Sequence, residues 1–161
     1  MLIVHPLAPL YNSSSRVLIL GTMPSPKSRE ARFFYAHPQN RFWRVLAAVF
    51  DEPLPPGTAE RSRFILSHHL ALWDVLHSCE ITGASDSSIK NPVPNDLSTI
   101  LKAAPIAAIF CTGAKSAALY KKLLLPVTNL PATTLPSPSP ANCAVSFDRL
   151  CEAYRQILPY L

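Results

Sequence analysis

The chain has 161 residues, of which 48% are hydrophobic and 16% are charged, so it is long and apolar enough to bury a core, and this composition argues against wholesale disorder. The formal net charge of +5 suits a polyanionic partner such as nucleic acid, although charge alone does not identify one. No apolar run is long enough to span a membrane, so we expect no membrane partner. The short apolar start lacks a basic segment before it, so we expect no signal peptide and a cytoplasmic protein. The length predicts one domain over residues 1–161.

Short apolar runs alternate with helical patterns along the chain. Val17–Leu20 is a continuous apolar run ended by Gly21, which favours a buried parallel strand. In residues 40–50 the apolar side chains recur at a helical spacing, which predicts an amphipathic helix. The further expected elements are a helix over 59–69, a strand over 70–76, a helix over 95–105 with Asn95 as N-cap, a strand over 106–113, a helix over 114–125, a strand over 132–135 and a helix over 146–157 capped by Ser146.

Strands that alternate with helices predict an α/β fold with a parallel sheet and helices on both of its faces. In such folds the site lies beyond the carboxyl ends of the strands. Three unusual segments follow expected strands, namely GTMPSPKS (21–28), TGAKS (112–116) and LPSPSPAN (135–142). We expect the first and third of them to form a pocket.

Generic motifs identify no metal, nucleotide or hydrolase site. The four cysteines have spacings that fit neither a zinc site nor an iron–sulfur cluster, so we expect buried free thiols and no metal. TGAKS is similar to half of a phosphate loop, and a plain helix start is the alternative interpretation. GTMPSPKS lacks the glycines of a P-loop, and the sequence contains no G-x-G-x-x-G, H-E-x-x-H or G-x-S-x-G motif.

The stretch FFYAHPQNRFW, residues 33–43, holds five aromatic residues together with a His, a Pro and an Asn. Aromatic residues at this density belong either to a core or to the lining of a pocket for a flat, polar ligand. Basic residues lie around the stretch and predict a positive rim beside such a pocket: Lys27, Arg29, Arg32, Arg41 and Arg44.

GTMPSPKS and FFYAHPQNRFW, followed by LPSPSPANCAVSFDRLCEAYRQIL, resemble the motifs of the uracil-DNA glycosylase superfamily, and the resemblance covers about Arg16 to Ile157. AHPQNRFW is similar to the mismatch-specific uracil/thymine-DNA glycosylases. The combination of GTMPS, NRFW, LWDVL…SDSSI…NDL and LPSPSPAN looks more like the hypoxanthine-DNA (deoxyinosine) glycosylase branch.

This resemblance implies a three-layer α/β/α sandwich with a central four-stranded parallel sheet. It also implies a monomeric, monofunctional enzyme, without metal or organic cofactor, that flips a deaminated base out of DNA and hydrolyses its N-glycosidic bond. Hypoxanthine is the expected base. The alternatives are a uracil- or mismatch-specific glycosylase, a catalytically inactive lesion-binding protein of the same fold, and a hydrolase of free nucleosides.

One departure from the family pattern concerns the water-positioning residue. In the mismatch-specific relatives the first motif reads G-x-N-P-G, and its Asn orients the attacking water. Met23 stands at that position here, and a thioether is only a weak hydrogen-bond acceptor. In the hypoxanthine branch the Asn is supplied by the position of Asn40, so we transfer the role to Asn40, for which a helix N-cap is the other interpretation.

The first two motifs also supply the expected base-binding residues. Tyr35 corresponds to the aromatic residue that stacks on the flipped base in the mismatch-specific relatives. Gly21 allows a sharp turn after the strand, so that backbone amides of Thr22 and Met23 face the base or the leaving group, in a loop fixed by Pro24 and Ser25. His37 either contacts the base or only hydrogen-bonds the backbone.

The third motif aligns with the superfamily segment that presses on DNA phosphates and enters the minor groove. Ser137 stands where other branches place a His or Asn as electrostatic partner of the base, and Ala141 stands where several relatives carry a Leu wedge. A rigid Pro-rich connector is the alternative. The expected DNA contacts are Pro138, Ser139, Pro140, Ala141, Asn142, Lys27 and Lys115.

Two carboxylates complete the candidates. Asp74 ends an expected strand near the site and acts either as a general base or as a structural hydrogen-bond acceptor. Asp86 is expected to cap a turn or helix.

Overall fold

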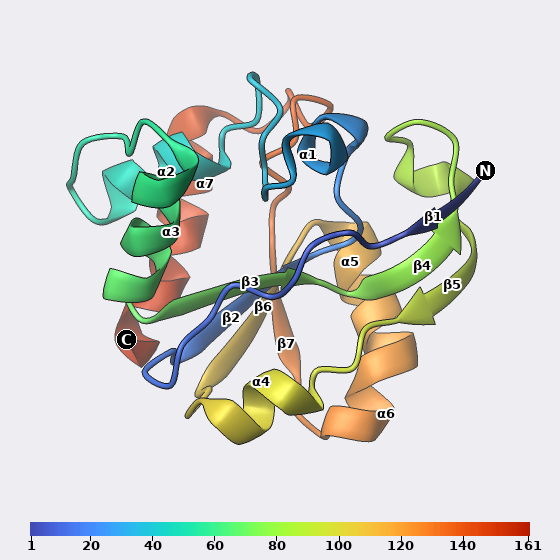
Figure 1. Cartoon of the computed structure of the whole chain (residues 1–161). Coiled ribbons are helices and arrows are strands. Elements are labelled where there is room, and N and C mark those ends of the chain that lie inside the picture. Colours follow the sequence, from blue (N-terminus) through green and yellow to red (C-terminus); the bar gives the residue numbers. More distant parts are fainter.

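A computed structural model describes residues 1–161, and its centre is a sheet of four parallel strands in the order β3–β2–β6–β7 (Figure 1). These strands are β2 (Val17–Gly21), β3 (Leu70–Asp74), β6 (Ala108–Thr112) and β7 (Ala132–Leu135). All five residues of β2 are buried, as expected for a central strand that is covered on both faces.

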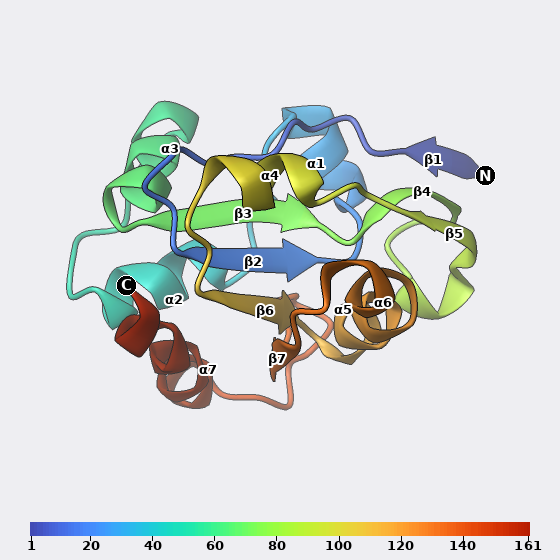
Figure 2. The same cartoon turned by 90° about the horizontal axis from the view of Figure 1, so that it is seen from below.

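Helices cover both faces of this sheet, as Figures 1 and 2 show. Val17 and Ile19 pack in one hydrophobic cluster, with α2 (Phe42–Val49), α3 (Thr58–Ser67) and α7 (Phe147–Tyr154). Leu18 and Leu20 pack in a second cluster, with α4 (Ser98–Ala103) and α5 (Ala114–Leu119). The alternation of a strand's side chains between its two faces thus builds two cores, and the predicted three-layer α/β/α sandwich is confirmed.

A second, smaller sheet was not predicted from the sequence. It is antiparallel, in the order β1–β4–β5, and consists of β1 (Leu2–Val4), β4 (Leu76–Glu80) and β5 (Lys90–Pro94). A short 3₁₀ helix, Asp86–Ser88, lies between β4 and β5. Helix α1 (Pro26–Ala31), which follows the end of β2, was not predicted either.

The junction between the two sheets corrects two predictions. The strand expected over 70–76 ends at Asp74, and Leu76 already belongs to the antiparallel sheet. Asn95 is not a helix cap, because its buried amide group donates to the carbonyls of Asp74 (2.9 Å) and Leu76 (3.0 Å). The Asp96 Oδ1 atom accepts instead from the Ser98 N–H at the start of α4 (2.9 Å).

The two C-terminal helical predictions hold with changed bounds. The helix expected over 114–125 is α5 followed by a π-helical turn, Tyr120–Leu124, and by α6 (Leu125–Thr128). Ser146 caps α7 as predicted, because its hydroxyl accepts from the Arg149 N–H at 3.2 Å. The last turns of the expected helix are a 3₁₀ helix, Arg155–Tyr160. No helix of the structure has the length and apolar character needed to cross a membrane.

Candidate active site

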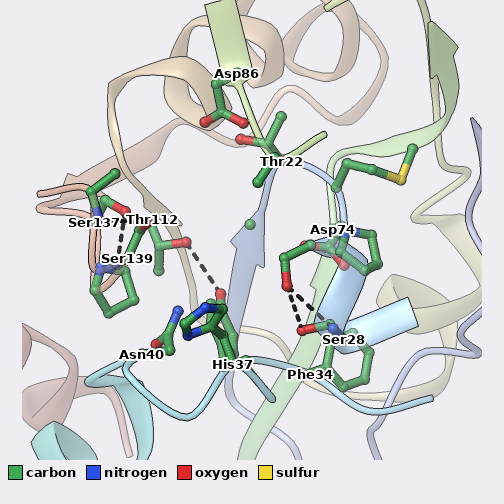
Figure 3. Close-up of a pocket in the computed structure, with 18 of the residues that line it drawn as sticks. Thr22, Ser28, Phe34, His37, Asn40, Asp74, Asp86, Thr112, Ser137 and Ser139 are labelled. Carbon is green, nitrogen blue, oxygen red and sulfur yellow. Dashed lines mark hydrogen bonds between the residues drawn. The ribbon is translucent and has the colours of Figure 1, made fainter. Parts of the chain in front are cut away.

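A cavity of about 280 Å³ lies at the carboxyl ends of the parallel strands (Figure 3). The predicted segments 21–28 and 135–142 both line it, together with part of the aromatic stretch, so the expected pocket is confirmed as a structural feature. Of the candidate residues, Lys27, Lys115 and Asn142 lie outside the lining. The lining contains all the others: Asn40, Ser137, Asp74, Gly21, Thr22, Met23, Pro24, Ser25, Tyr35, His37, Pro138, Ser139, Pro140 and Ala141.

The floor of the pocket is built where three strands end. Gly21 and Asp74 are register partners on β2 and β3, and Thr112 ends the neighbouring strand β6. A Cβ atom on Gly21 would lie 2.5 Å from Asp74 Oδ1, 3.3 Å from the Tyr35 hydroxyl and 3.6 Å from Thr112 Oγ1. Only glycine therefore leaves room for these three oxygen atoms to converge.

The hydroxyl of Tyr35 lies 3.1 Å from Thr112 Oγ1, which ties the aromatic stretch to the end of β6. Burial raises the pKa of Tyr35 far above its ordinary value, and the nearby Asp74 carboxylate raises it further. The phenol therefore stays neutral at physiological pH.

The aromatic stretch is both core and pocket wall. The Tyr35 ring stacks on the Phe42 ring with centroids 3.8 Å apart, so one face of the tyrosine is already covered by the protein. Phe33 stacks on Trp43 at 5.5 Å, and the Trp43 indole N–H donates to the Phe34 carbonyl at 3.1 Å. Phe34 is buried and also lines the pocket. The stretch thus contributes to both the core and the pocket lining, the two alternatives that its aromatic density left open.

Asn40 and His37 are held by local hydrogen bonds at the pocket edge. The Asn40 carboxamide oxygen accepts from the N–H of Phe42, the first residue of α2, at 2.9 Å, and Asn40 also lines the cavity. The N-cap residue of α2 is Arg41, one position after the cap considered at Asn40. His37 Nδ1 accepts from the Gln39 N–H at 3.1 Å, which places the proton of the neutral ring on Nε2.

The loop after β2 is fixed by its serines and by one arginine. Ser25 caps α1 by accepting from the Ser28 N–H at 3.2 Å, and Ser28 Oγ accepts from the Ala36 N–H at 3.1 Å. The Arg29 guanidinium donates to the Pro24 carbonyl at 2.7 Å, so this member of the expected basic rim supports the loop. The backbone N–H groups of Thr22 and Met23 donate to no backbone carbonyl.

The loop that follows β7 is held in place by Arg41 of the aromatic stretch, residues 33–43. Arg41 donates from its backbone to the Pro138 carbonyl (3.0 Å) and from its guanidinium to the carbonyls of Val145 (2.6 Å) and Asn142 (2.9 Å). Asn142 in turn donates to the Ser137 carbonyl at 2.9 Å, which explains why its side chain lies outside the pocket. The Arg41 guanidinium therefore stabilises this loop and is not a free positive charge at the rim of the pocket.

The two serines of this loop stabilise its turns. Ser137 Oγ accepts from the Ser139 N–H, and Ser139 Oγ accepts from the Ala141 N–H, both at 3.2 Å. Gly113, at φ +100°, lets the end of β6 approach this loop, because a Cβ there would lie 3.3 Å from the Ser137 Cβ. Of the segment TGAKS, only Thr112 reaches the pocket.

Asp86 is a lining residue to which the sequence assigned only a structural role. It begins the 3₁₀ helix, where its carbonyl accepts from the Ile89 N–H at 3.3 Å, and it lies at the side of the cavity occupied by Thr22 (Figure 3). Desolvation raises the pKa of its carboxyl group, and the opposite charge of Lys115 acts against that rise. Lys115, near the start of α5, is thus close enough to Asp86 for its charge to act on that carboxyl group.

His5 is the site residue that sequence reasoning missed. Its Nε2 atom lies 2.7 Å from Asp74 Oδ2, and its ring is buried behind the pocket. The two residues are 69 positions apart in the chain, so no spacing or motif links them. The only signal was a histidine within the apolar start of the sequence.

The described residues contain no group of three or more His, Cys, Asp or Glu side chains that could hold a metal ion. All four cysteines are free thiols, as predicted. The expectation that all are buried is wrong for Cys143, which is exposed in the loop that Arg41 braces.

Comparison with known proteins gives one consistent result. The family model of the uracil DNA glycosylase superfamily matches residues 8–161. A protein named hypoxanthine DNA glycosylase from Methanosarcina acetivorans is 31% identical over 88% of this chain and 89% of its own length. Another of the same name from Methanosarcina barkeri is 28% identical over 72% of this chain and 74% of its own. The solution structure of a candidate uracil DNA glycosylase from M. acetivorans superposes with a TM-score of 0.81 at 25% identity, covering 98% of this chain and 99% of that one.

Proposed function

The chain belongs to the uracil DNA glycosylase superfamily, and from this premise we propose that it is a monofunctional DNA glycosylase that removes hypoxanthine from DNA. The observation that carries the proposal is the cavity in which Asn40, Asp74 and the 137–141 loop face one another at the ends of the parallel strands. The two Methanosarcina relatives named hypoxanthine DNA glycosylase support the choice of base.

Hydrolysis of the C1′–N bond builds positive charge on the sugar and negative charge on the departing base. An enzyme accelerates it by holding a water at the sugar, by donating hydrogen bonds to the leaving base and by excluding other water. The protein needs donors and a neutral positioning group for this work, and the pocket lining offers both.

Asn40 is the proposed water-positioning residue. Its carboxamide is fixed at one end by the Phe42 N–H, so the group is oriented before the substrate arrives. An amide is not a general base at neutral pH, so its contribution is orientation of the water. Met23 also lines the pocket, but its thioether cannot take this role.

Donors for the leaving base come from three places. The Thr22 and Met23 N–H groups are not used by backbone carbonyls, and His37 carries its proton on Nε2. Ser137 Oγ accepts from Ser139, which leaves its own proton for donation. We propose that these groups stabilise charge on the base as the bond breaks, and that the free face of Tyr35 stacks on it.

The DNA strand is proposed to run across the 137–141 loop, beside the exposed Arg44, and toward Lys27 and Lys115. Contacts to the phosphates fix the position of a protein on the DNA without recognising the base sequence. We further propose that the protein acts as a monomer in the cytoplasm.

Labelled duplexes with a single inosine, uracil or xanthine site test the proposal. After incubation with the protein, alkali cleaves the strand wherever an abasic site has formed. We expect scission mainly at inosine. Scission mainly at uracil would support the uracil-specific alternative, and tight binding without scission at any site would support an inactive lesion-binding protein.

A further inference from the structure

The mechanism proposed above gives no chemical step to Asp74, which lines the pocket, or to His5, which contacts Asp74 from behind. His5 is 9% exposed and Asp74 is 5% exposed, and their side chains meet at 2.7 Å. A buried carboxylate is unfavourable unless hydrogen bonds satisfy it.

The hydrogen bonds of His5 fix its tautomer. The Leu7 N–H donates to His5 Nδ1 at 3.1 Å, so Nδ1 is an acceptor and carries no proton. The proton of the neutral ring is then on Nε2, where it is donated to Asp74 Oδ2. Asp74 thus receives a hydrogen bond on one oxygen from behind the pocket.

His5 is itself held firmly. Its backbone N–H donates to the His77 carbonyl at 2.6 Å, and its ring lies edge-on to the Trp73 ring at 6.1 Å. The Trp73 indole N–H donates to the Leu7 carbonyl at 3.0 Å, and Leu10 pairs with Leu72 through two backbone hydrogen bonds of 2.9 Å. The N-terminal segment is therefore anchored along β3 and delivers His5 to a defined place.

The second oxygen of Asp74 faces the pocket floor. Oδ1 lies 2.5 Å from the point where a Cβ of Gly21 would be, close to the Tyr35 and Thr112 hydroxyls. A carboxylate bonded in this way can only accept hydrogen bonds. A flipped base placed over Gly21 must therefore present an N–H to this oxygen.

We propose that His5 is a positioning residue that aims the Asp74 carboxylate over Gly21, where Oδ1 accepts the ring N–H of a lactam base. This inference rests on the proposed function and adds to it the feature by which the base is chosen. Hypoxanthine carries such an N–H at N1, beside its carbonyl group, whereas adenine has a lone pair at N1. A lone pair facing Oδ1 is repelled, so the pair discriminates a deaminated base from its normal parent.

The proposed role of His5 is tested by measuring the binding of the protein to duplexes that it cannot cleave, so the readout does not depend on catalysis. The two probes contain 2′-fluoroarabino-hypoxanthine or 2′-fluoroarabino-adenine nucleotides at one site, and fluorescence anisotropy gives the ratio of their dissociation constants. The variants are His5→Leu, which removes the donor, His5→Gln, which keeps an N–H near Nε2, and Asp74→Asn.

The wild-type protein is expected to prefer the hypoxanthine probe. His5→Leu lowers this preference about 10-fold or more, on the scale of one hydrogen bond to a charged group, whereas His5→Gln retains most of it. In Asp74→Asn the amide oxygen turns to His5 Nε2–H and the amino group faces the pocket, so the preference shifts toward adenine. Adding His5→Leu to Asp74→Asn lowers the preference for hypoxanthine no further.

If His5 had a purely structural role, His5→Leu would weaken the binding of both probes equally and leave the ratio of their dissociation constants unchanged. That result would overturn the inference. Should His5→Leu fail to fold, an unchanged ratio in Asp74→Asn would overturn it as well. Cleavage of an inosine duplex by the wild type is measured in parallel. Absence of cleavage together with a ratio that depends on His5 would refute the proposed function and support the inference.

Discussion

Gly21 and Asp74 face each other across the β2–β3 register so closely that a Cβ on Gly21 would lie 2.5 Å from Asp74 Oδ1. Gly21→Ala must therefore displace a buried carboxylate that is already bonded to His5. We expect a stability loss of about 1–3 kcal/mol from overpacking and a loss of activity on the order of 100-fold. Chemical denaturation and single-turnover cleavage measure the two effects.

Gly57→Ala is the matched control. A Cβ on Gly57 would also lie 2.5 Å from an oxygen, but this is Glu60 Oε2, at the end of a flexible side chain that is 43% exposed. It can move at little cost, so we expect unchanged activity and a stability loss below about 1 kcal/mol. Equal losses in the two variants would contradict the assignment of Gly21 as the floor of the site.

Asn95 joins the two sheets, and its replacement tests that junction. Asn95→Leu removes the donor to two buried carbonyls, those of Asp74 and Leu76. We expect a loss of about 2–3 kcal/mol in the free energy of unfolding. Asp96→Ala, which removes only the exposed cap of α4, should cost less than about 1 kcal/mol. The reverse order would restore the sequence-based assignment of Asn95 as the cap.

Arg41 braces the 137–145 loop through two carbonyls that only a planar, forked donor reaches together. Arg41→Lys keeps the charge but loses this geometry, so we expect the dissociation constant for a lesion duplex to rise about 10-fold. Arg44→Lys keeps the charge at an exposed position and is expected to bind normally. If Arg41→Lys binds the duplex as tightly as the wild type, charge rather than the two carbonyl bonds explains the contribution of Arg41.

Cys143 is expected to be the one thiol that reacts rapidly in the native protein. Burial raises the pKa of Cys111 to about 12 and raises the pKa values of Cys79 and Cys151, so these thiols stay protonated at pH 8. A thiol-reactive probe should label one site in the native chain and all four in denaturant.

DNA should slow this labelling, because Cys143 lines a cleft with Arg41 and Arg44 beside the pocket. An abasic duplex is the appropriate ligand, and an unrelated protein with an exposed cysteine serves as the control. Labelling that is unaffected by saturating duplex would contradict the proposed path of the DNA strand.

Three strands of the parallel sheet, β2, β3 and β6, could be predicted from the sequence because each contains an apolar run. The bounds expected for the fourth strand, 132–135, are those of β7. The smaller sheet gave no such signal, because β5 contains two prolines within KNPVP and β1 has only one partly buried residue. A single helix was expected over 114–125, and periodicity does not reveal a π-helical turn inside such a pattern.

The lining of the site could be predicted where motifs carry it, as at Asn40, Ser137 and Tyr35. Contacts between distant segments could not. His5 reaches Asp74 only because the N-terminal segment pairs with β3, and Asp86 enters the pocket only because the smaller sheet folds its connection back toward Thr22. Arg41 was expected on a charged rim, but the carbonyls that it binds lie more than a hundred positions away.

The most direct test of the whole account is the release of free hypoxanthine from an inosine-containing duplex by the wild-type protein and by Asn40→Ala, measured under single-turnover conditions. We predict that the wild type releases the base and leaves an abasic site, and that the variant binds the same duplex but is slower by at least about 100-fold, the scale of losing one positioned transition-state group. A wild-type protein that binds without releasing hypoxanthine, or an Asn40→Ala variant of near-normal rate, would contradict the account.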